Sequence, residues 1–375
     1  MSFRYAAGFN PASVNTLVAP TPGYYLYNLF MWGRNGSGQI GDGTTASKSS
    51  PTQVGSLTTW SLISSNSNHT IAIKTDGTMW AWGGNNRGQL GLGNTTYYSS
   101  PKQVGALTNW SKISTMQNGA LAVKTDGTLW AWGQNDSGQL GTGNSTYYSS
   151  PKHIGALTTW AQVLGGQNFG FAVKTDGTLW SWGYNANGAL GNSSITSRSS
   201  PAQIGALTNW STPANAIWGN AAFIKTNGTL WTWGFNPRGG LGTGNLIRYS
   251  SPKQVGSLTN WLSVSCGYSL TGAVKTDGTL WTWGGNGTGG MGIGNTTYYY
   301  SPKQVGALTT WSKISVGQSH MISIRTDGTL WAWGTNNEGN LGLGNRTNYS
   351  SPVQVGSSTT WLTLASSYNT SGARG

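Results

Sequence analysis

Few residues of this sequence could carry out chemistry. Its 375 residues include eight acidic residues, three histidines and one cysteine. Five of the acids precede glycine in a recurring Asp-Gly-Thr segment, where aspartate normally forms a turn. These are Asp76, Asp126, Asp176, Asp277 and Asp327. The other three, Asp42, Asp136 and Glu338, fall in separate glycine-rich loops, so no carboxylate pair for general acid–base catalysis is expected.

The histidines and the cysteine are equally isolated. His69, His153 and His320 show no metal-ligand spacing, and Cys266 has no histidine near it in the sequence. The Gly-x-Gly-Asn loops lack the lysine and the strand–helix context of a phosphate-binding loop. We therefore expect no catalytic residue, no metal ion and no cofactor, and we predict that the protein is not an enzyme.

A repeat of about 50 residues accounts for most of the chain. Its clearest marker is a Trp-Gly pair. The tryptophans of this pair are Trp32, Trp82, Trp132, Trp182, Trp233, Trp283 and Trp333. A Ser-Pro pair and a Thr-x-Trp triplet recur in step with it, once in each of seven units.

Each unit has the pattern of four short β-strands. The recurring Lys-Thr-Asp-Gly-Thr-Leu-Trp segment is typical of a hairpin with an Asp-Gly turn, and Asn227 keeps the turn chemistry in the one unit that lacks the aspartate. Two further runs, Pro-x-Gln-Val and Trp-x-x-Ile-Ser, complete the four. Seven such units predict an all-β fold, a seven-bladed β-propeller with four-stranded blades. We expect all but one of the 21 tryptophans to pack between blades.

The two ends of the chain divide one repeat between them. The last unit stops just before its own Trp-Gly segment would begin, and the first unit starts with that missing piece. We expect the N- and C-terminal strands to pair and close the ring, which removes two open sheet edges. The predicted domains are a propeller over residues 23–375 and an extended N-terminal arm over residues 1–22, which we expect to anchor the module to an assembly.

The repeat resembles the regulator of chromosome condensation repeat. The segments MWAWGGNNRGQLGLGN at 79–94 and LWAWGQNDSGQLGTGN at 129–144 carry this resemblance, which extends over about residues 23–375. It implies a seven-bladed propeller and a packing role for His69 and His320, and it transfers no active site. The family's founding member is a nucleotide-exchange factor for a small nuclear GTPase that also docks on chromatin. The near-identical, Thr- and Asn-rich units resemble bacterial and bacteriophage versions, which are often virion proteins.

The formal net charge of +13 favours anionic partners. One set of cations precedes the Asp-Gly turns and is a candidate basic ring. It comprises Lys74, Lys124, Lys174, Lys225, Lys275 and Arg325. A second set follows the Ser-Pro pairs: Lys102, Lys152, Lys253 and Lys303. The alternative is that these are separate solvated lysines that only keep the surface soluble.

Tyrosines form a second candidate binding ring, three or four residues before the repeat prolines. They are Tyr97, Tyr98, Tyr147, Tyr148, Tyr249, Tyr298, Tyr299 and Tyr349. Their loops suit protein contacts or sugar stacking, and the alternative is that they cover the outer strand. The most irregular unit adds a third candidate contact at Pro213 and Trp218, and the proline should confine its strand to a sheet edge or a bulge.

The leading functional hypothesis is a non-enzymatic bacteriophage virion component, on the capsid surface, fibre or tail, that binds another virion protein through residues 1–22. An anionic host polysaccharide is a further candidate partner, ahead of nucleic acid. The alternatives are an intracellular guanine-nucleotide-exchange or chromatin- and DNA-binding propeller, and a bacterial surface adhesin. The sequence has no apolar stretch that could span a membrane and no recognisable signal peptide. We therefore expect a virion location after synthesis in the host cytoplasm, or else a cytoplasmic or extracellular one.

Overall fold

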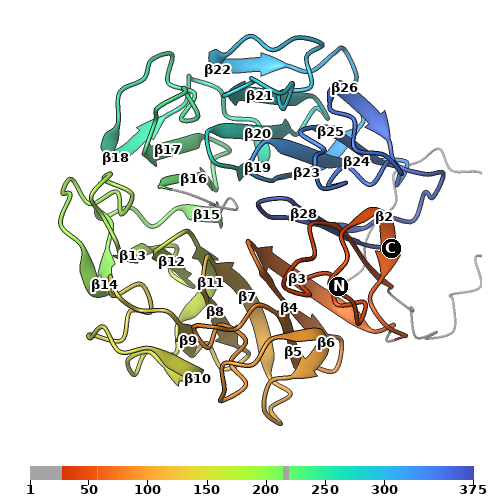
Figure 1. Cartoon of the computed structure of the whole chain (residues 1–375). Coiled ribbons are helices and arrows are strands. Elements are labelled where there is room, and N and C mark those ends of the chain that lie inside the picture. The colour runs from red at the N-terminus through yellow and green to blue at the C-terminus, as the bar shows by residue number, and fades with distance from the viewer. Residues whose placement is uncertain (1–27, 57, 214–218) are drawn as a thin grey trace, which may run out of the picture.

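The computed structural model describes residues 28–56, 58–213 and 219–375. These residues form 28 strands in seven antiparallel four-stranded sheets, arranged around a central axis (Figure 1). The predicted all-β, seven-bladed propeller is therefore confirmed. The predicted arm at residues 1–22 lies outside the described residues, as does Trp218. No helix in the described part of the chain could cross a membrane.

Six blades are built from consecutive strands that run from the axis outward (Figure 1). The first is β3 (Trp60–Asn66), β4 (His69–Lys74), β5 (Met79–Gly83) and β6 (Tyr98–Gln103). The second is β7 (Trp110–Met116), β8 (Gly119–Lys124), β9 (Leu129–Gly133) and β10 (Tyr148–His153). The third is β11 (Trp160–Gly165), β12 (Phe169–Lys174), β13 (Leu179–Gly183) and β14 (Arg198–Gln203).

The remaining consecutive blades follow the same order. The fourth is β15 (Trp210–Pro213), β16 (Asn220–Lys225), β17 (Leu230–Gly234) and β18 (Tyr249–Gln254). The fifth is β19 (Trp261–Cys266), β20 (Leu270–Lys275), β21 (Leu280–Gly284) and β22 (Tyr299–Gln304). The sixth is β23 (Trp311–Val316), β24 (His320–Arg325), β25 (Leu330–Gly334) and β26 (Tyr349–Gln354).

The seventh blade joins the two ends of the chain. Its strand order is β2-β1-β28-β27, with β1 (Leu29–Gly33) and β2 (Lys48–Gln53) beside β28 (Thr370–Arg374) and β27 (Thr363–Ser366). β1 pairs with β28 along its whole length, from Leu29 opposite Arg374 to Gly33 opposite Thr370. The predicted closure of the ring by terminal strands is confirmed.

The Asp-Gly-Thr segment forms the turn between the second and third strands of a blade. In the first blade the Asp76 carboxylate accepts hydrogen bonds from the Thr78 backbone N–H (2.9 Å) and hydroxyl (2.6 Å). The Thr78 hydroxyl in turn accepts one from the Trp80 indole N–H (2.9 Å). Gly77 has a φ of +77°, which glycine adopts without strain. Asn227 accepts the same two bonds from Thr229 in the fourth blade, so the predicted equivalence of Asp and Asn holds.

Each Trp-Gly tryptophan ties its blade to the preceding one. The Trp82 indole N–H donates to the Gln39 backbone carbonyl, and the Trp132 indole N–H to that of Gln89. The bond recurs at all seven interfaces with lengths of 2.8–3.0 Å, including Trp32 to Asn340 across the closure. All seven of these tryptophans are fully buried. Seven apolar clusters fill the spaces between neighbouring blades around them.

Two histidines are buried at the same place in the repeat, next to the following blade. The Nε2 atom of His69 lies 3.2 Å from the Gly119 carbonyl oxygen, and that of His320 lies 2.9 Å from the Ser371 hydroxyl on β28. Burial lowers the pKa of His69 to about 4 and that of His320 to about 3. Both are therefore neutral packing residues at neutral pH, in the role that the resemblance implied.

The glycine against each indole gives a direct test of the blade interface. Gly91 has a φ of +71°, and a Cβ there would lie 2.8 Å from the Trp132 Nε1 atom. We expect Gly91→Ala to lower the free energy of unfolding by about 2–5 kcal/mol, since backbone strain and overpacking add. Gly105→Ala is the control, because Gly105 has a similar φ of +62° but open space around it. It should cost about 1–2 kcal/mol. Urea unfolding would measure both, and equal losses would contradict the role given to the indole contact.

The buried histidines predict a loss of stability in mild acid. Their pKa values lie below 6.5 in the folded state, so the unfolded chain binds more protons as the pH falls from 6.5 toward about 4. Each histidine should lower the free energy of unfolding by up to about 1.4 kcal/mol per pH unit in that window. His69→Phe and His320→Leu copy the residues found at this position in other blades, Phe169 and Leu270. The double variant should unfold with a shallower pH dependence between pH 7 and 5, and an unchanged slope would contradict this explanation.

Candidate binding surface

The described residues bring no three His, Cys, Asp or Glu side chains together in a group that could hold a metal ion. Cys266 is buried, and burial raises the pKa of its thiol to about 12. His153 packs against the Trp130 ring, with centroids 5.1 Å apart and ring planes tilted by 35°. Asp136 accepts hydrogen bonds from Tyr147 and Gln134 within its own blade. These contacts give the isolated residues packing and loop roles.

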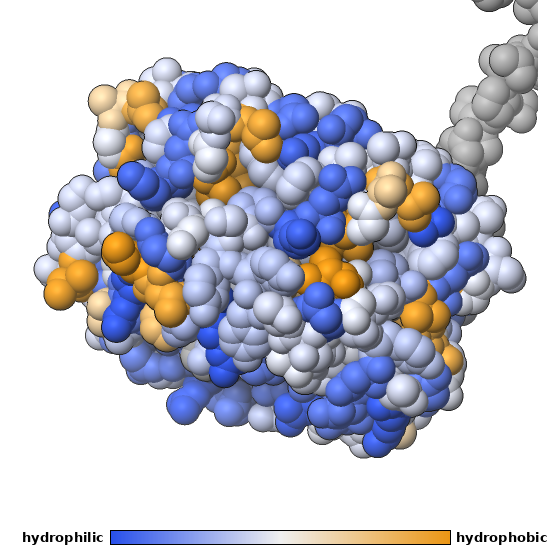
Figure 2. Space-filling view, turned by 90° about the horizontal axis from the view of Figure 1, so that it is seen from above, coloured by the Kyte–Doolittle hydropathy of each residue, from blue (hydrophilic) through white to orange (hydrophobic). Residues whose placement is uncertain are grey.

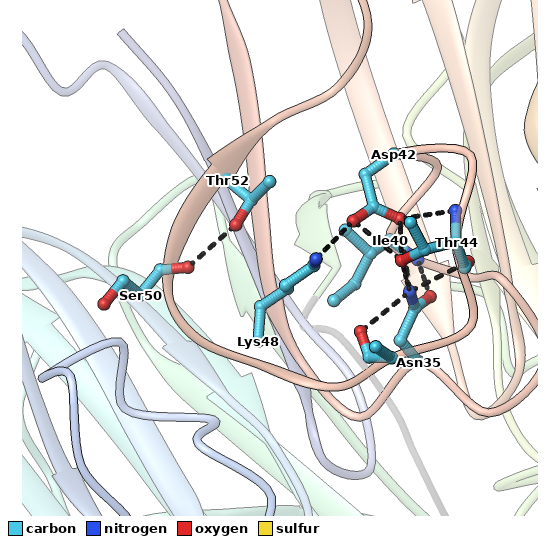
Figure 3. A network of polar contacts seen from close by, with 8 residues as sticks. Asn35, Ile40, Asp42, Thr44, Lys48, Ser50 and Thr52 are labelled. Atoms are coloured by element: carbon cyan, nitrogen blue, oxygen red, sulfur yellow. Dashed lines mark hydrogen bonds and ion pairs between the residues drawn. The ribbon is translucent and has the colours of Figure 1, made fainter.

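An asparagine that recurs in every repeat organises each glycine-rich loop, and sequence reasoning missed its role. Asn35 accepts a hydrogen bond from the Ile40 N–H (2.9 Å) and donates to the carbonyls of Thr44 (3.0 Å) and Ala46 (3.1 Å) (Figure 3). The six equivalent asparagines are almost fully buried and accept the same N–H bond. The signal was the invariant Asn two residues after each Trp-Gly pair.

The first of these loops also holds an ion pair. Asp42 lies 3.0 Å from the Lys48 ammonium and accepts hydrogen bonds from the Thr44 N–H and hydroxyl (Figure 3). Burial raises the pKa of Asp42, but Lys48 and Thr44 outweigh it and hold the pKa below its usual value. This is the one ion pair among the described residues. The cations discussed next are therefore not neutralised by direct contact with a carboxylate.

The cations of the candidate basic ring are each held between two tryptophans. In the six blades built from consecutive strands, the cation before the turn lies 3.6–4.5 Å from the centre of the first Trp of the Trp-x-Trp segment. It lies 4.6–5.6 Å from the centre of the Thr-x-Trp ring. These are cation–π contacts. The ring is thus a set of recessed cations rather than freely solvated lysines.

The recess is deep enough to desolvate several of these cations. Lys124, Lys225 and Lys275 are only 5–7% exposed, and burial lowers the pKa of each. Burial also lowers the pKa of Arg325, and its Nε atom is buried with no hydrogen-bond partner in the described structure. Their charge is stabilised mainly by the tryptophan faces, which leaves their N–H donors available.

The second basic set remains at the surface. Lys102, Lys152, Lys253 and Lys303 end the outer strands, and each ammonium lies 5.5–5.9 Å from the ring of a tyrosine on the same strand. All four lysines are exposed.

The tyrosine ring divides into two kinds of residue. Tyr98, Tyr148, Tyr249 and Tyr349 are half-buried, and each phenol oxygen accepts a hydrogen bond from a loop asparagine at 3.0–3.3 Å. Tyr299 occupies the same place and packs against the neighbouring blade. Tyr97 and Tyr298 are exposed, while Tyr147 is tied to Asp136. The eight side chains therefore do not form one continuous exposed surface. Five of them, at the position of Tyr98 in the repeat, are partly buried against the blades.

Of the two residues singled out in the irregular unit, the described structure includes Pro213. Pro213 ends β15, which is the innermost and edge strand of its sheet, and it lies opposite Phe223. This agrees with the edge position that the proline predicts. The structure does not bring Pro213 near the tyrosine or lysine sets, which lie on the outer strands and turns of the blades.

Sequence reasoning also missed a set of exposed leucines in the loop that leads from an outer strand to the next blade. Each is 44–49% exposed: Leu107, Leu157, Leu207, Leu258 and Leu308. These loops contact the Asp-Gly turns, as the Trp110 N–H bond to the Gly77 carbonyl shows (3.2 Å). We call the surface made by the turns and these loops the Asp-Gly face. Seen from above the view of Figure 1, the molecule shows apolar residues as separate patches within a largely hydrophilic surface (Figure 2).

A groove lies beside this face between neighbouring blades. Between the fifth and sixth blades it has a volume of about 450 Å³ and is lined by Lys303, Leu308, Trp311, Arg325 and Trp331, among others. An equivalent groove at the closing blade has a volume of about 500 Å³ and is lined by Trp361, Gly356 and Ser358. The two differ in charge, because Gly375 follows Arg325 by one repeat and takes the place of the cation.

The comparisons with known proteins agree with the fold. Human WBSCR16 is 20% identical, with a TM-score of 0.84 over 93% of this chain and 98% of that one. Prp20p from Saccharomyces cerevisiae, in a structure whose title refers to its binding to Gsp1p and histones, is 17% identical, with a TM-score of 0.83 over 93% and 91%. Yeast RCC1 (Prp20) bound to Kap60 gives a TM-score of 0.82 at 17% identity, over 94% and 90%. A comparison with curated protein sequences gave no match.

The family models account for nearly all of the described chain. The RCC1-like domain matches residues 27–269, and the Regulator of chromosome condensation (RCC1) repeat matches residues 277–324 and 327–373. With seven blades closed by β1 and β28, the chain belongs to the regulator of chromosome condensation repeat family.

Proposed function

We propose that this chain is a protein-binding propeller of the exchange-factor or chromatin-docking kind, and that it holds an acidic surface of a protein partner against its Asp-Gly face. The observation that carries the proposal is the recurrence of a large exposed leucine at the same place in five loops of that face. Exposed apolar residues that recur beside cations are typical of a protein contact.

The charge of the molecule supports an acidic partner. The chain carries a net charge of +13, and the outer-strand lysines end close to the leucine loops, as Lys303 and Leu308 do in one groove. Complementary charge would speed the encounter with an acidic surface of the partner. The leucines would then supply the buried contact area.

The structural neighbours support the same class of function. Prp20p is described as binding Gsp1p and histones, and a second structure of it contains Kap60. Neither the family models nor these neighbours support the virion hypothesis drawn from the style of the repeat. They support the alternative prediction of a nucleotide-exchange or chromatin-binding propeller better, and they provide the first partners to test.

Leucine substitutions on the Asp-Gly face test this proposal. We expect purified, nucleotide-free Gsp1p to bind the propeller and the double variant Leu157→Asp, Leu258→Asp to bind at least tenfold more weakly, because it places charges in the apolar contact. Ile195→Asp is the control, since Ile195 is 67% exposed in a loop between β13 and β14. Surface plasmon resonance would measure the affinities, with circular dichroism confirming the fold of each variant.

Parallel titrations with core histones and with a DNA duplex separate the alternatives. Binding to DNA alone, with an affinity that falls steeply as salt rises, would overturn the protein-binding proposal in favour of nucleic acid. A loss caused equally by Ile195→Asp would place the contact elsewhere. Binding of none of the three probes would contradict the exchange-factor and chromatin assignments together.

A further inference from the structure

The grooves between blades combine three features that recur together. In the groove between the fifth and sixth blades, the Arg325 guanidinium lies 3.6 Å from the Trp331 ring centre and 4.8 Å from that of Trp311. Leu308 and Lys303 line the same groove. By the repeat, the same leucine–cation pairs belong to four more interfaces: Leu107 with Lys124, Leu157 with Lys174, Leu207 with Lys225, and Leu258 with Lys275.

These cations have unused hydrogen-bonding capacity. Only the Lys48–Asp42 contact is an ion pair in the described structure, so none of the five is paired with a carboxylate. The Arg325 Nε atom is buried with no acceptor. A desolvated cation that lacks an acceptor binds an anion more strongly than a surface lysine does, because the interaction is formed at a lower effective dielectric.

From this geometry we infer that each of these five grooves accepts one acidic side chain of a protein partner, with an apolar side chain of the same segment packed on the adjacent leucine. The inference rests on the proposed function and names the chemistry of its partner. A volume of about 450 Å³ suits a few residues of a peptide rather than a folded element.

The surroundings favour separate carboxylates over a continuous polyanion. The Asp-Gly turns place an aspartate two residues after each lysine in three of these interfaces and after Arg325, as in Lys124 and Asp126. Hydrogen bonds from Thr128 hold the pKa of Asp126 below its usual value, so it is charged at neutral pH. A nucleic acid or sulfated glycan lying across the face would meet these carboxylates as well as the cations. An acidic side chain that enters the groove reaches the cation directly.

The walls of the groove point to a peptide as well. Ile293, Leu308 and Pro352 are apolar and would be left uncovered by a sugar or a phosphate backbone. An acidic segment with interspersed leucines would cover them and would also neutralise the cation.

The closing blade provides an internal control. Its groove contains Trp361, but Ser358 stands where the other five have leucine and Gly375 where they have the cation. Both proposed recognition elements are thus missing from one interface of the same molecule. We therefore expect peptide to bind in five grooves and not in the groove at the closing blade. The interface of Lys74 is not counted, because residue 57 lies outside the described residues.

The test uses the full chain and a synthetic peptide, Glu-Leu-Glu-Leu-Glu, that carries a photoactivatable benzophenone. A matched Gln-Leu-Gln-Leu-Gln peptide has the same shape without charge. We expect the glutamate peptide to crosslink in the five grooves and not beside Trp361, as read by mass spectrometry of the distinct repeat peptides. The glutamine peptide should crosslink at least tenfold less.

Two variants of one groove make the result specific. Arg325→Met removes the charge and leaves an unbranched apolar side chain between the two tryptophans. Lys303→Ala removes an exposed lysine that does not lie between tryptophans. We expect Arg325→Met to abolish crosslinking in its own groove while the other four remain, and Lys303→Ala to weaken it severalfold. Thermal unfolding would show whether each variant is folded, and Lys303→Ala keeps the test decisive if Arg325→Met is not.

Three results would overturn the inference: equal crosslinking beside Trp361, equal crosslinking by the glutamine peptide, or no effect of either variant. Stronger binding of a DNA duplex or of heparin, unaffected by Arg325→Met, would assign the face to polyanions instead. If the leucine variants weaken Gsp1p binding and the cation variants do not, the proposed function stands and this inference fails.

Discussion

The indole N–H of each Trp-Gly tryptophan donates to a loop carbonyl of the preceding blade, and the rest of the molecule depends on this contact. It fixes the glycine-rich loop against the next blade, where a Cβ on the loop glycine would collide with the indole. The same loop then donates a backbone N–H to the outer strand of that blade, as Gly43 does to Ser99 (2.8 Å). Because the bond recurs at every interface, including Trp32 to Asn340, the closure of the ring uses the same chemistry as its interior.

The tryptophans have a second consequence for the surface. Two of them in each regular blade enclose a cation, and this places positive charge in recesses beside the Asp-Gly face instead of on freely moving side chains. A recessed cation contributes packing through its aliphatic stem and remains charged because of the aromatic faces. Packing and recognition therefore use the same residues. In the closing blade, Ser358 stands at the position of the leucine and Gly375 at the position of the cation.

Much of the architecture could be predicted from the sequence, because it depends on local turn chemistry and on a regular period. The Asp-Gly segments predicted the hairpins, the recurring tryptophans predicted the blades, and the divided repeat predicted the pairing of β1 with β28. The surface was harder. Lys124 lies opposite Trp110 in the strand register, a pairing that a ring drawn from spacing alone does not show. Leu107 resembles a core residue in its Val-Gly-Ala-Leu-Thr context, and its exposure depends on where the loop crosses the next blade. The role of Asn35 depends on a loop conformation that no local propensity specifies.

Hydrogen–deuterium exchange of the propeller, with and without the Glu-Leu-Glu-Leu-Glu peptide, tests the central claim most directly. That claim is that recognition takes place on the Asp-Gly face. We predict that bound peptide slows exchange at residues 104–109 and 91–94 and their counterparts, which line the grooves, and leaves residues 84–90 and the closing blade unchanged. Protection confined to residues 84–90 and their counterparts on the other side of the blades would contradict the account.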